Sequence, residues 1–259
     1  LPLQIDSSNP KVLESAMRIY NGKPLINSVN GKAESMAAVF PLVKKYGGVV
    51  VALTLDESGI PNNVEGRFAI AEKILKCAES YGIDKKDIVI DVLAMTISSD
   101  PQGAKTTLEA LRLVKERYQV CTVLGVSNIS FGLPNRGIIN SNFYTMAMQN
   151  GLSAGIINPS SEAMMQAYYS FCALMGYDEN CQIYIEKCGN QKKDMGISNV
   201  KSQMDLQTII IKGLKDEDVH KVTGFVVDKD PIIRYIAGFV IPMVFIFGVY
   251  VVLNGHLSP

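Results

Sequence analysis

The sequence contains no tryptophan and only two histidines among its 259 residues, His220 and His256. Both histidines follow the region in which apolar strands and helices alternate. Histidine-based acid–base or metal chemistry is therefore not expected in that region. The formal net charge is zero, from 25 acidic and 25 basic residues. Because no basic excess exists to attract phosphates, we expect no nucleic acid as a partner.

The five cysteines are scattered and odd in number. No CxxC pair occurs, and Cys181 and Cys188 are seven residues apart without a neighbouring histidine, so we expect no zinc site. Reduced thiols in a cytoplasmic protein are the simplest interpretation. No signal peptide opens the chain, which begins directly in a strand at positions 1–6, as a truncated chain would.

Six short runs rich in Val, Ile and Leu predict β-strands. They show little polar alternation, as is typical of strands buried on both faces of a parallel sheet. The runs are Pro2–Ile5, Pro24–Val29, Gly48–Leu55, Ile88–Leu93, Val120–Val126 and Ser153–Ile157.

Helical segments with recognisable start signals lie between these runs. The starts are Ser8-Asn9-Pro10, Pro61, Asp100-Pro101 and Ser160-Ser161-Glu162. Alternating strands and helices predict an α/β fold with a parallel sheet, either an open doubly wound sheet or a closed barrel. The segment 6–9 after the first strand contains no glycine, which disfavours the nucleotide-binding open sheet. We therefore expect a barrel that lacks its first strands.

Polar residues gather where the predicted strands end. Asp6, Asn27 and Asp91 each lie at or near the C-terminal end of an apolar run, and residues 124–134 add an amide, hydroxyls and a glycine turn. In parallel barrels and sheets this edge binds ligands. The pattern indicates a pocket for a flat heterocycle that forms hydrogen bonds.

Structural roles compete with this interpretation. Asp6 could cap a helix or form a turn, Asn27 and Asn30 could be turn residues, and Asn128 could cap the segment that follows its strand. Asp91 is harder to explain as a structural residue, because an unpaired buried carboxylate is costly.

Residues 1–190 resemble the pterin-binding barrel of methyltetrahydrofolate methyltransferases, a family that includes the folate module of cobalamin-dependent methionine synthase and the folate:corrinoid/iron–sulfur protein methyltransferase. Several motifs follow the family's order. They are Ile5-Asp6-Ser7-Ser8-Asn9-Pro10, Leu25-Ile26-Asn27-Ser28-Val29-Asn30, Leu53 to Pro61, Ile90-Asp91, Val123 to Ser130, Met146-Ala147-Met148 and Gly151-Leu152.

The resemblance implies an incomplete (β/α)8 TIM barrel. Six of the eight strand–helix units are expected here, because two units precede the corresponding segment in the family. This chain departs from the family at Asp91-Val92, where proline usually follows the aspartate. The departure alters the local backbone but keeps the carboxylate. An unclosed barrel also exposes sheet edges, so a homo-oligomer is one expected outcome.

The resemblance also implies roles for individual residues in a methyl transfer from 5-methyltetrahydrofolate to a corrinoid (cobalamin). Asp6, Asn27 and Asp91 would hold the pterin, and Asn128 would be the catalytic residue that forms a hydrogen bond near N5. Gly125 and Ser127 would shape the floor of the pocket. Asn158 would form a nearby wall or a contact through water.

The polar residues 191–203 are expected to be a linker. Residues 204–230 resemble part of the helical cap of a cobalamin module, which favours the methionine synthase arrangement. The family's cobalamin-binding Asp-x-His-x-x-Gly motif is missing, so the cobalamin is expected on a partner domain or protein.

Residues 231–259 form a candidate transmembrane helix. From Ile236 to Leu253 there are 18 residues without a charge, just long enough to cross a bilayer. This tail resembles the opening span of the B-type membrane subunit of multisubunit Na⁺/H⁺ antiporters. Membrane contact through 236–253 and a fusion or assembly joint near 227–231 are therefore both expectations.

Two further functions compete with the methyltransferase. A condensation of the dihydropteroate synthase type uses the same barrel, but no lysine and arginine pair stands at the strand ends to hold a pterin pyrophosphate. The other is a non-catalytic, membrane-tethered fragment or fusion related to a cation/proton antiporter subunit.

Overall fold

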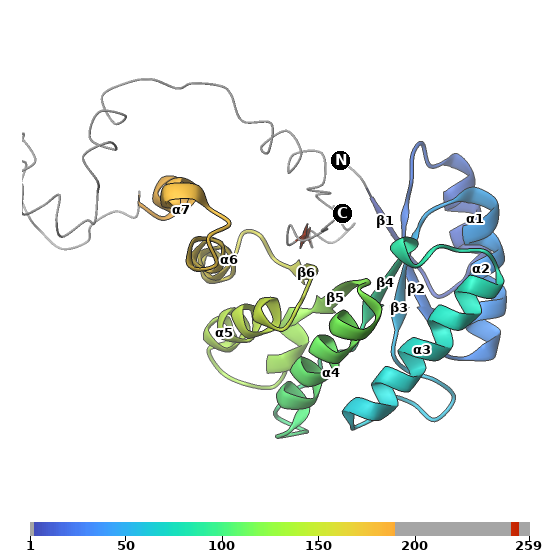
Figure 1. Ribbon diagram of the computed structural model, residues 1–259, viewed down its shortest axis with the longest axis horizontal. Coiled ribbons are helices and arrows are strands. Elements are labelled where there is room, and N and C mark those ends of the chain that lie inside the picture. Colours follow the sequence, from blue (N-terminus) through green and yellow to red (C-terminus); the bar gives the residue numbers. More distant parts are fainter. Residues whose placement is uncertain (1–2, 190–249, 254–259) are drawn as a thin grey trace, which may run out of the picture.

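The computed structural model of the protein describes residues 3–189 and 250–253. Six strands alternate with helices over the first of these ranges (Figure 1). The strands are β1 (Gln4–Asp6), β2 (Leu25–Asn30), β3 (Val49–Leu53), β4 (Ile88–Asp91), β5 (Cys121–Gly125) and β6 (Ala154–Ile157). The α-helices are α1 (Pro10–Ile19), α2 (Ala33–Tyr46), α3 (Val64–Ser80), α4 (Gly103–Tyr118), α5 (Arg136–Gln149), α6 (Glu162–Leu174) and α7 (Gln182–Cys188).

The strand order identifies the type of sheet. Each strand from β1 to β6 pairs in parallel with the next one in sequence, so the order never reverses. A doubly wound sheet reverses its order at a switch point, whereas a barrel does not. Helices α1 to α5 lie along one side of the curved sheet (Figure 1), as in a barrel wall. The six units therefore form a half-barrel, which confirms the predicted fold.

The two faces of the sheet bury different sets of side chains. Alternate strand residues such as Ile26, Ile90 and Leu124 pack against the helices in the main core. The residues between them point to the inside of the half-barrel, where Val51 and Val123 belong to a smaller apolar cluster. Burial on both faces explains why the strand sequences lack polar alternation.

Two of the four predicted helix starts are confirmed to the residue, at Pro10 for α1 and Glu162 for α6. Helix α3 begins at Val64, three residues after Pro61, because the Asn63 side chain caps it through the Gly66 N–H. Helix α4 begins at Gly103, since Asp100 first forms a turn by accepting the N–H of Gln102.

Helices α2, α5 and α7 were not predicted individually. Helix α2 carries Pro41 in its interior, a residue that normally argues against a helix. Helix α7 is short, and none of its residues is buried. Neither helix therefore has a clear sequence signal.

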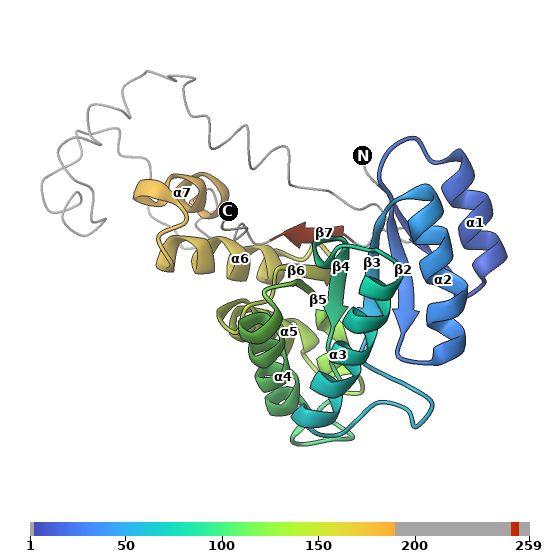
Figure 2. The same cartoon turned by 45° about the vertical axis from the view of Figure 1, so that its right-hand side comes forward.

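The C-terminal prediction is partly wrong. Residues Tyr250–Leu253 form a strand, β7, that pairs antiparallel with β6 (Figure 2), so the helix predicted over 236–253 does not include these four residues. The predicted linker at 191–203, the cap at 204–230 and the rest of the candidate transmembrane segment lie outside the described residues. Within 3–189 and 250–253, no helix has the length and hydropathy that a bilayer span requires.

Candidate functional site

Asp6 and Asn27 face each other at one end of the half-barrel. They are direct register partners on β1 and β2, and the Asn27 amide Nδ2 donates to Asp6 Oδ2 across 3.2 Å. Both belong to the alternate residues that point inward, and Asp6 is exposed. A carboxylate has about four acceptor sites, and the hydrogen bond from Asn27 uses one of them. Asp6 therefore retains acceptor capacity for a ligand.

Neighbouring residues fill the helix-cap and turn roles that were considered for Asp6 and Asn27. Helix α1 is capped by Asn9, whose side chain accepts the N–H of Lys11, so Asp6 is not its cap. The turn after β2 uses Asn30, which accepts the N–H of Lys32. Asn27 instead bonds to Asp6. The pair is thus not used for a helix cap or a turn.

Asp91 ends β4 and points inward between two apolar neighbours, Leu53 on β3 and Val123 on β5. Its side chain is buried, and among the described residues its carboxylate accepts one hydrogen bond, from the Leu93 N–H at 2.8 Å. Burial raises the pKa of Asp91 to about 7, although the Leu93 N–H and the Arg67 charge oppose the rise. Such a buried, weakly satisfied carboxyl at a strand end is typical of a binding group.

Asn128 lies directly over Gly125 at the end of β5. It belongs to the short 3-10 helix Val126–Ser130, and its exposed side chain has no hydrogen-bond partner among the described residues. A Cβ added at Gly125 would come within 2.9 Å of the Asn128 Nδ2. Glycine is therefore required at the strand end for the amide to lie against it.

This contact makes Gly125→Ala a test of the amide position. The backbone at Gly125 has a φ of −73°, which alanine adopts easily, and the clashing atom is the end of a flexible side chain. We expect the free energy of unfolding to change by less than about 1 kcal/mol. The displaced Asn128 amide should lower the rate of the reaction it serves by on the order of 10²-fold.

The matched control is Gly137→Ala in α5, where an added Cβ meets nothing within 4 Å. Thermal unfolding and turnover are measured for both variants. Equal turnover of Gly125→Ala and the wild type would show that the position of the amide is unimportant.

Ser127 and Asn158 are the remaining predicted site residues. The Ser127 carbonyl accepts a hydrogen bond from Arg136, while Asn158 follows β6 and is exposed. The Asn158 side-chain oxygen accepts the Ser160 N–H at 2.9 Å. This oxygen therefore forms a turn before α6, and the amide nitrogen is the more available group.

Two arginines that the sequence analysis did not single out support these residues. Arg136 donates to the Ser127 carbonyl and to the Ser130 hydroxyl, and it stacks on the Phe131 ring at 4.6 Å. Arg67 is fully buried behind Asp91. Both arginines lie in the first turn of a helix, where the dipole disfavours cations, and that position is the signal which could have identified them.

The loops behind Asp91 and Asn128 are bonded to each other. The Thr96 and Ser98 hydroxyls both donate to the Phe131 carbonyl, at 2.7 and 2.8 Å. The Ile97 N–H donates to the Ile129 carbonyl at 3.0 Å. These contacts hold the ends of β4 and β5 as one wall.

The ends of β1, β2, β4 and β5 therefore present one polar rim. The Asp6–Asn27 pair lies on β1 and β2, Asp91 on β4, and Gly125 with Asn128 at β5. Carboxylate oxygens and the carboxamides of Asn27 and Asn128 gather at this rim. Such a set suits a flat ligand with several N–H donors on one edge.

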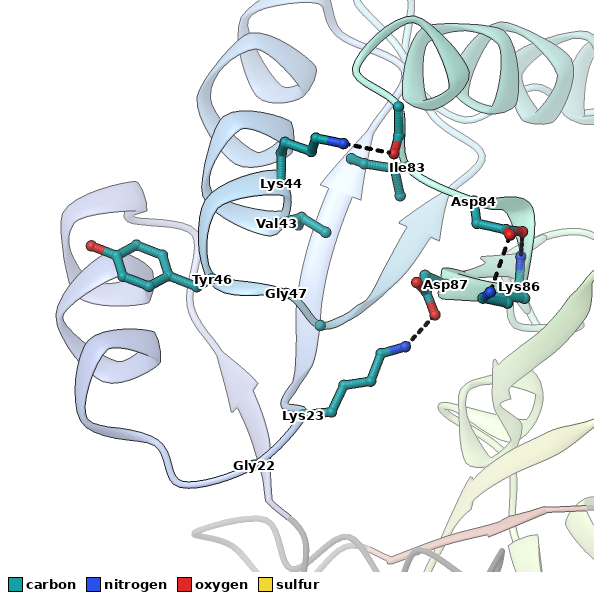
Figure 3. A pocket seen from close by; sticks show the side chains of 12 residues that line it. Gly22, Lys23, Val43, Lys44, Tyr46, Gly47, Ile83, Asp84, Lys86 and Asp87 are labelled. Carbon is teal, nitrogen blue, oxygen red and sulfur yellow. Dashed lines mark hydrogen bonds and ion pairs between the residues drawn. The ribbon is translucent and has the colours of Figure 1, made fainter.

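A cavity of about 420 Å³ lies elsewhere, in the loops that precede β2, β3 and β4 (Figure 3). It is therefore at the opposite end of the strands from the polar rim. Its lysines are already engaged: Lys23 with Asp87, Lys86 with Asp84, and Lys44 with the Gly82 carbonyl. In parallel barrels this end contributes to stability, whereas ligands bind at the other end.

The class of protein follows from comparison with known sequences. The profile of the pterin binding enzyme family matches residues 1–158, which is more than half of the chain. This chain belongs to that family. The matched region includes all six parallel strands and every predicted site residue.

Among characterised relatives, a methylcorrinoid:tetrahydrofolate methyltransferase of Eubacterium limosum is 32% identical over 186 residues, which cover 71% of this chain and 69% of that protein. Methionine synthases of Mycobacterium leprae and Mycobacterium tuberculosis are 36% and 35% identical over 173 residues. The chain spans only 14% of either methionine synthase. No finding supports the predicted likeness of the tail to an antiporter subunit.

Similar solved structures include two dihydropteroate synthases. The enzyme from Stenotrophomonas maltophilia, with active site-bound imidazole, has a TM-score of 0.54, and that from Xanthomonas albilineans, in complex with 7,8-dihydropteroate, has a TM-score of 0.50. Each is 20% identical and covers 68% of this chain and 69% of its own. At that identity the likeness shows the barrel-type fold alone.

Proposed function

We propose that this chain binds 5-methyltetrahydrofolate at the polar rim and donates its methyl group to a corrinoid cofactor held by a partner domain or protein. The observation that carries the proposal is the shared orientation of the Asp6–Asn27 pair, Asp91 and Asn128 at the carboxyl ends of the strands. The relatives also support it, since one is a methylcorrinoid:tetrahydrofolate methyltransferase and another is a methionine synthase.

The pterin ring fits the chemistry of the rim. Its amidine-like edge carries a 2-amino group and a ring N–H, both donors, which pair with the acceptor oxygens of carboxylates. Asp91 and Asp6 supply such oxygens, and the oxygen of the Asn27 side-chain amide is an additional acceptor. Gly125 and Ser127 would form the floor, and Asn158 a wall.

Transfer of the methyl group requires stabilisation of the departing N5 nitrogen. A tertiary amine is a poor leaving group unless a proton or a hydrogen bond stabilises the charge that develops on it. The Asn128 amide has both a donor and an acceptor and no protein partner among the described residues. We assign it to N5. A corrinoid supplies the nucleophilic cobalt centre, so the protein needs no covalent nucleophile of its own.

The division of the chain is part of the same proposal. Residues 1–190 would be the pterin-binding portion, 191–203 a linker, and 204–230 part of the cap of a cobalamin module. An arrangement like that of methionine synthase would place the corrinoid on a further domain. A cytoplasmic location remains a prediction, based on the expected reduced thiols. Association between copies also remains a prediction, based on the sheet edges that an unclosed barrel exposes.

The assay mixes the full chain with methyltetrahydrofolate and free cob(I)alamin and follows the absorbance of methylcobalamin. We expect protein-dependent formation of methylcobalamin, and also the reverse reaction from methylcobalamin and tetrahydrofolate, since one pocket serves both directions. Condensation of a dihydropterin pyrophosphate with p-aminobenzoate, without any methyl transfer, would instead favour a dihydropteroate synthase. Failure of methyltetrahydrofolate to bind would contradict the proposal.

A further inference from the structure

Among the described residues, Arg67 is the most completely buried charged residue that the proposed mechanism leaves unused. It projects from the first turn of α3, and its relative exposure is 0%. Its Nη1 atom donates to the carbonyls of Val92 and Leu93, at 2.9 and 2.7 Å, and to the Thr107 hydroxyl at 3.0 Å. Its Nε atom donates to the Pro61 carbonyl at 2.9 Å. One guanidinium thus joins the loop before α3 to the loop after β4.

The carbonyls that Arg67 holds belong to the two residues directly after Asp91. Leu93 adopts a φ of +64°, a left-handed conformation that is unfavourable for a leucine. In that conformation its N–H donates to Asp91 Oδ1 at 2.8 Å. The Thr107 hydroxyl also donates to the Leu93 carbonyl, at 3.1 Å. Arg67 and Thr107 therefore hold Leu93 in the geometry that orients the Asp91 carboxylate.

The charge of Arg67 acts on Asp91 as well. The neighbours of Asp91 on β3 and β5, Leu53 and Val123, are uncharged, and Arg67 is the charged group that favours its ionised form. Asp100, in the loop before α4, acts on Arg67 in turn. Among the described residues no ion pair joins Arg67 to Asp91. Arg67 therefore acts on Asp91 through its hydrogen bonds to the Val92 and Leu93 carbonyls and through the electrostatic field of its charge.

We infer that Arg67 is a positioning residue for the pterin pocket: it holds Leu93 in its left-handed conformation and so presents Asp91 to the ligand in the orientation and charge state that binding requires. This inference rests on the proposed function for its ligand, 5-methyltetrahydrofolate. Its effect on Asp91 is measurable without any ligand.

The test uses the full chain with Arg67→Met, which removes the charge and the donors, and Arg67→Lys, which keeps the charge. Methyltetrahydrofolate affinity is measured by calorimetry, and the Asp91 carboxyl is titrated by ¹³C NMR after assignment with Asp91→Asn. We expect Arg67→Met to raise the Asp91 midpoint by on the order of one pH unit and to weaken binding by about tenfold or more. Arg67→Lys should keep the midpoint closer to that of the wild type but still weaken binding, because a lysine cannot span both carbonyls.

A second substitution separates positioning from general stability. Leu93→Gly removes the cost of the left-handed backbone, so Arg67→Lys/Leu93→Gly should recover roughly fivefold in affinity over Arg67→Lys. Arg112→Met is the matched control, since Arg112 is exposed on α4 and pairs with Glu116 on the same helix. If Arg67→Met fails to fold, Arg67→Lys with and without Leu93→Gly still tests the positioning role, through the loss and recovery of affinity.

The outcomes distinguish the two proposals. An Asp91 midpoint and an affinity that stay unchanged in both Arg67 variants would overturn the inference. A loss of stability with no change in the midpoint and no recovery by Leu93→Gly would make Arg67 merely structural, and would also overturn it. Absence of methyltetrahydrofolate binding by the wild type, together with shifted midpoints in the variants, would overturn the proposed function and support the role of Arg67.

Discussion

Replacement of Asn128 by alanine should lower the rate of methyl transfer by roughly 10²–10³-fold, the loss typical of removing one preorganised hydrogen-bonding group from a developing charge. The Asn128 side chain is exposed and has no protein partner among the described residues, so its removal should leave stability nearly unchanged. Methyltetrahydrofolate affinity should fall much less than the rate, because the acceptors on β1, β2 and β4 remain.

The measurement is single-turnover formation of methylcobalamin under saturating methyltetrahydrofolate, alongside calorimetric binding. Asn21→Ala is the matched control, since Asn21 is exposed in the loop before β2, at the other end of the strands. A rate for Asn128→Ala within twofold of the wild type would show that Asn128 takes no part in the catalytic step.

Asp91→Asn should have opposite effects on stability and on binding. A carboxyl whose folded-state pKa lies above its ordinary value stabilises the fold fully below that ordinary value and loses this contribution as the pH rises through the folded pKa. For Asp91 the window runs from 3.8 to about 7. At 1.36 kcal/mol per pKa unit, the cost of ionising the buried group above pH 7 reaches at most ~4 kcal/mol.

We therefore expect Asp91→Asn to be more stable than the ligand-free wild type at pH 8, with a difference that shrinks toward pH 4. An asparagine oxygen can still accept the Leu93 N–H, but it cannot match the charge of the carboxylate against the pterin donors. Methyltetrahydrofolate affinity should fall by on the order of 10²-fold.

Urea unfolding of both proteins across pH 4–8 measures the first effect, and calorimetry at pH 8 measures the second. Asp6→Asn is the control for the stability measurement, because Asp6 is exposed and its replacement relieves no burial cost. A stability difference that is independent of pH would contradict the assignment of Asp91 as a buried titrating group.

Strand positions and rim residues were predictable from the sequence because they depend on local patterns. Runs of branched apolar residues marked all six parallel strands, and each predicted run overlaps its observed strand. The polar residues that follow them, such as Asp6 and Asp91, could be placed at one edge because parallel strands end together. Their inward orientation then follows from the alternation of side chains along each strand.

The supporting groups were not predictable in the same way. Arg67 lies 24 residues before Asp91 in sequence, and its role depends on where α3 packs against the loop after β4. The contact between Gly125 and Asn128 depends on the 3-10 turn after β5, which no periodicity announces. The uncharged stretch ending at Leu253 was predicted as a helix because of its length, but its last four residues pair with β6 as a strand.

A crystal structure of the full chain with bound methyltetrahydrofolate would show where the folate binds. We expect the pterin ring inside the half-barrel at the strand ends, with its amino edge toward Asp91 and the Asp6–Asn27 pair, and with N5 within hydrogen-bonding distance of the Asn128 amide. A pterin bound instead in the cavity between Lys23 and Asp84, at the opposite end of the strands, would contradict this expectation.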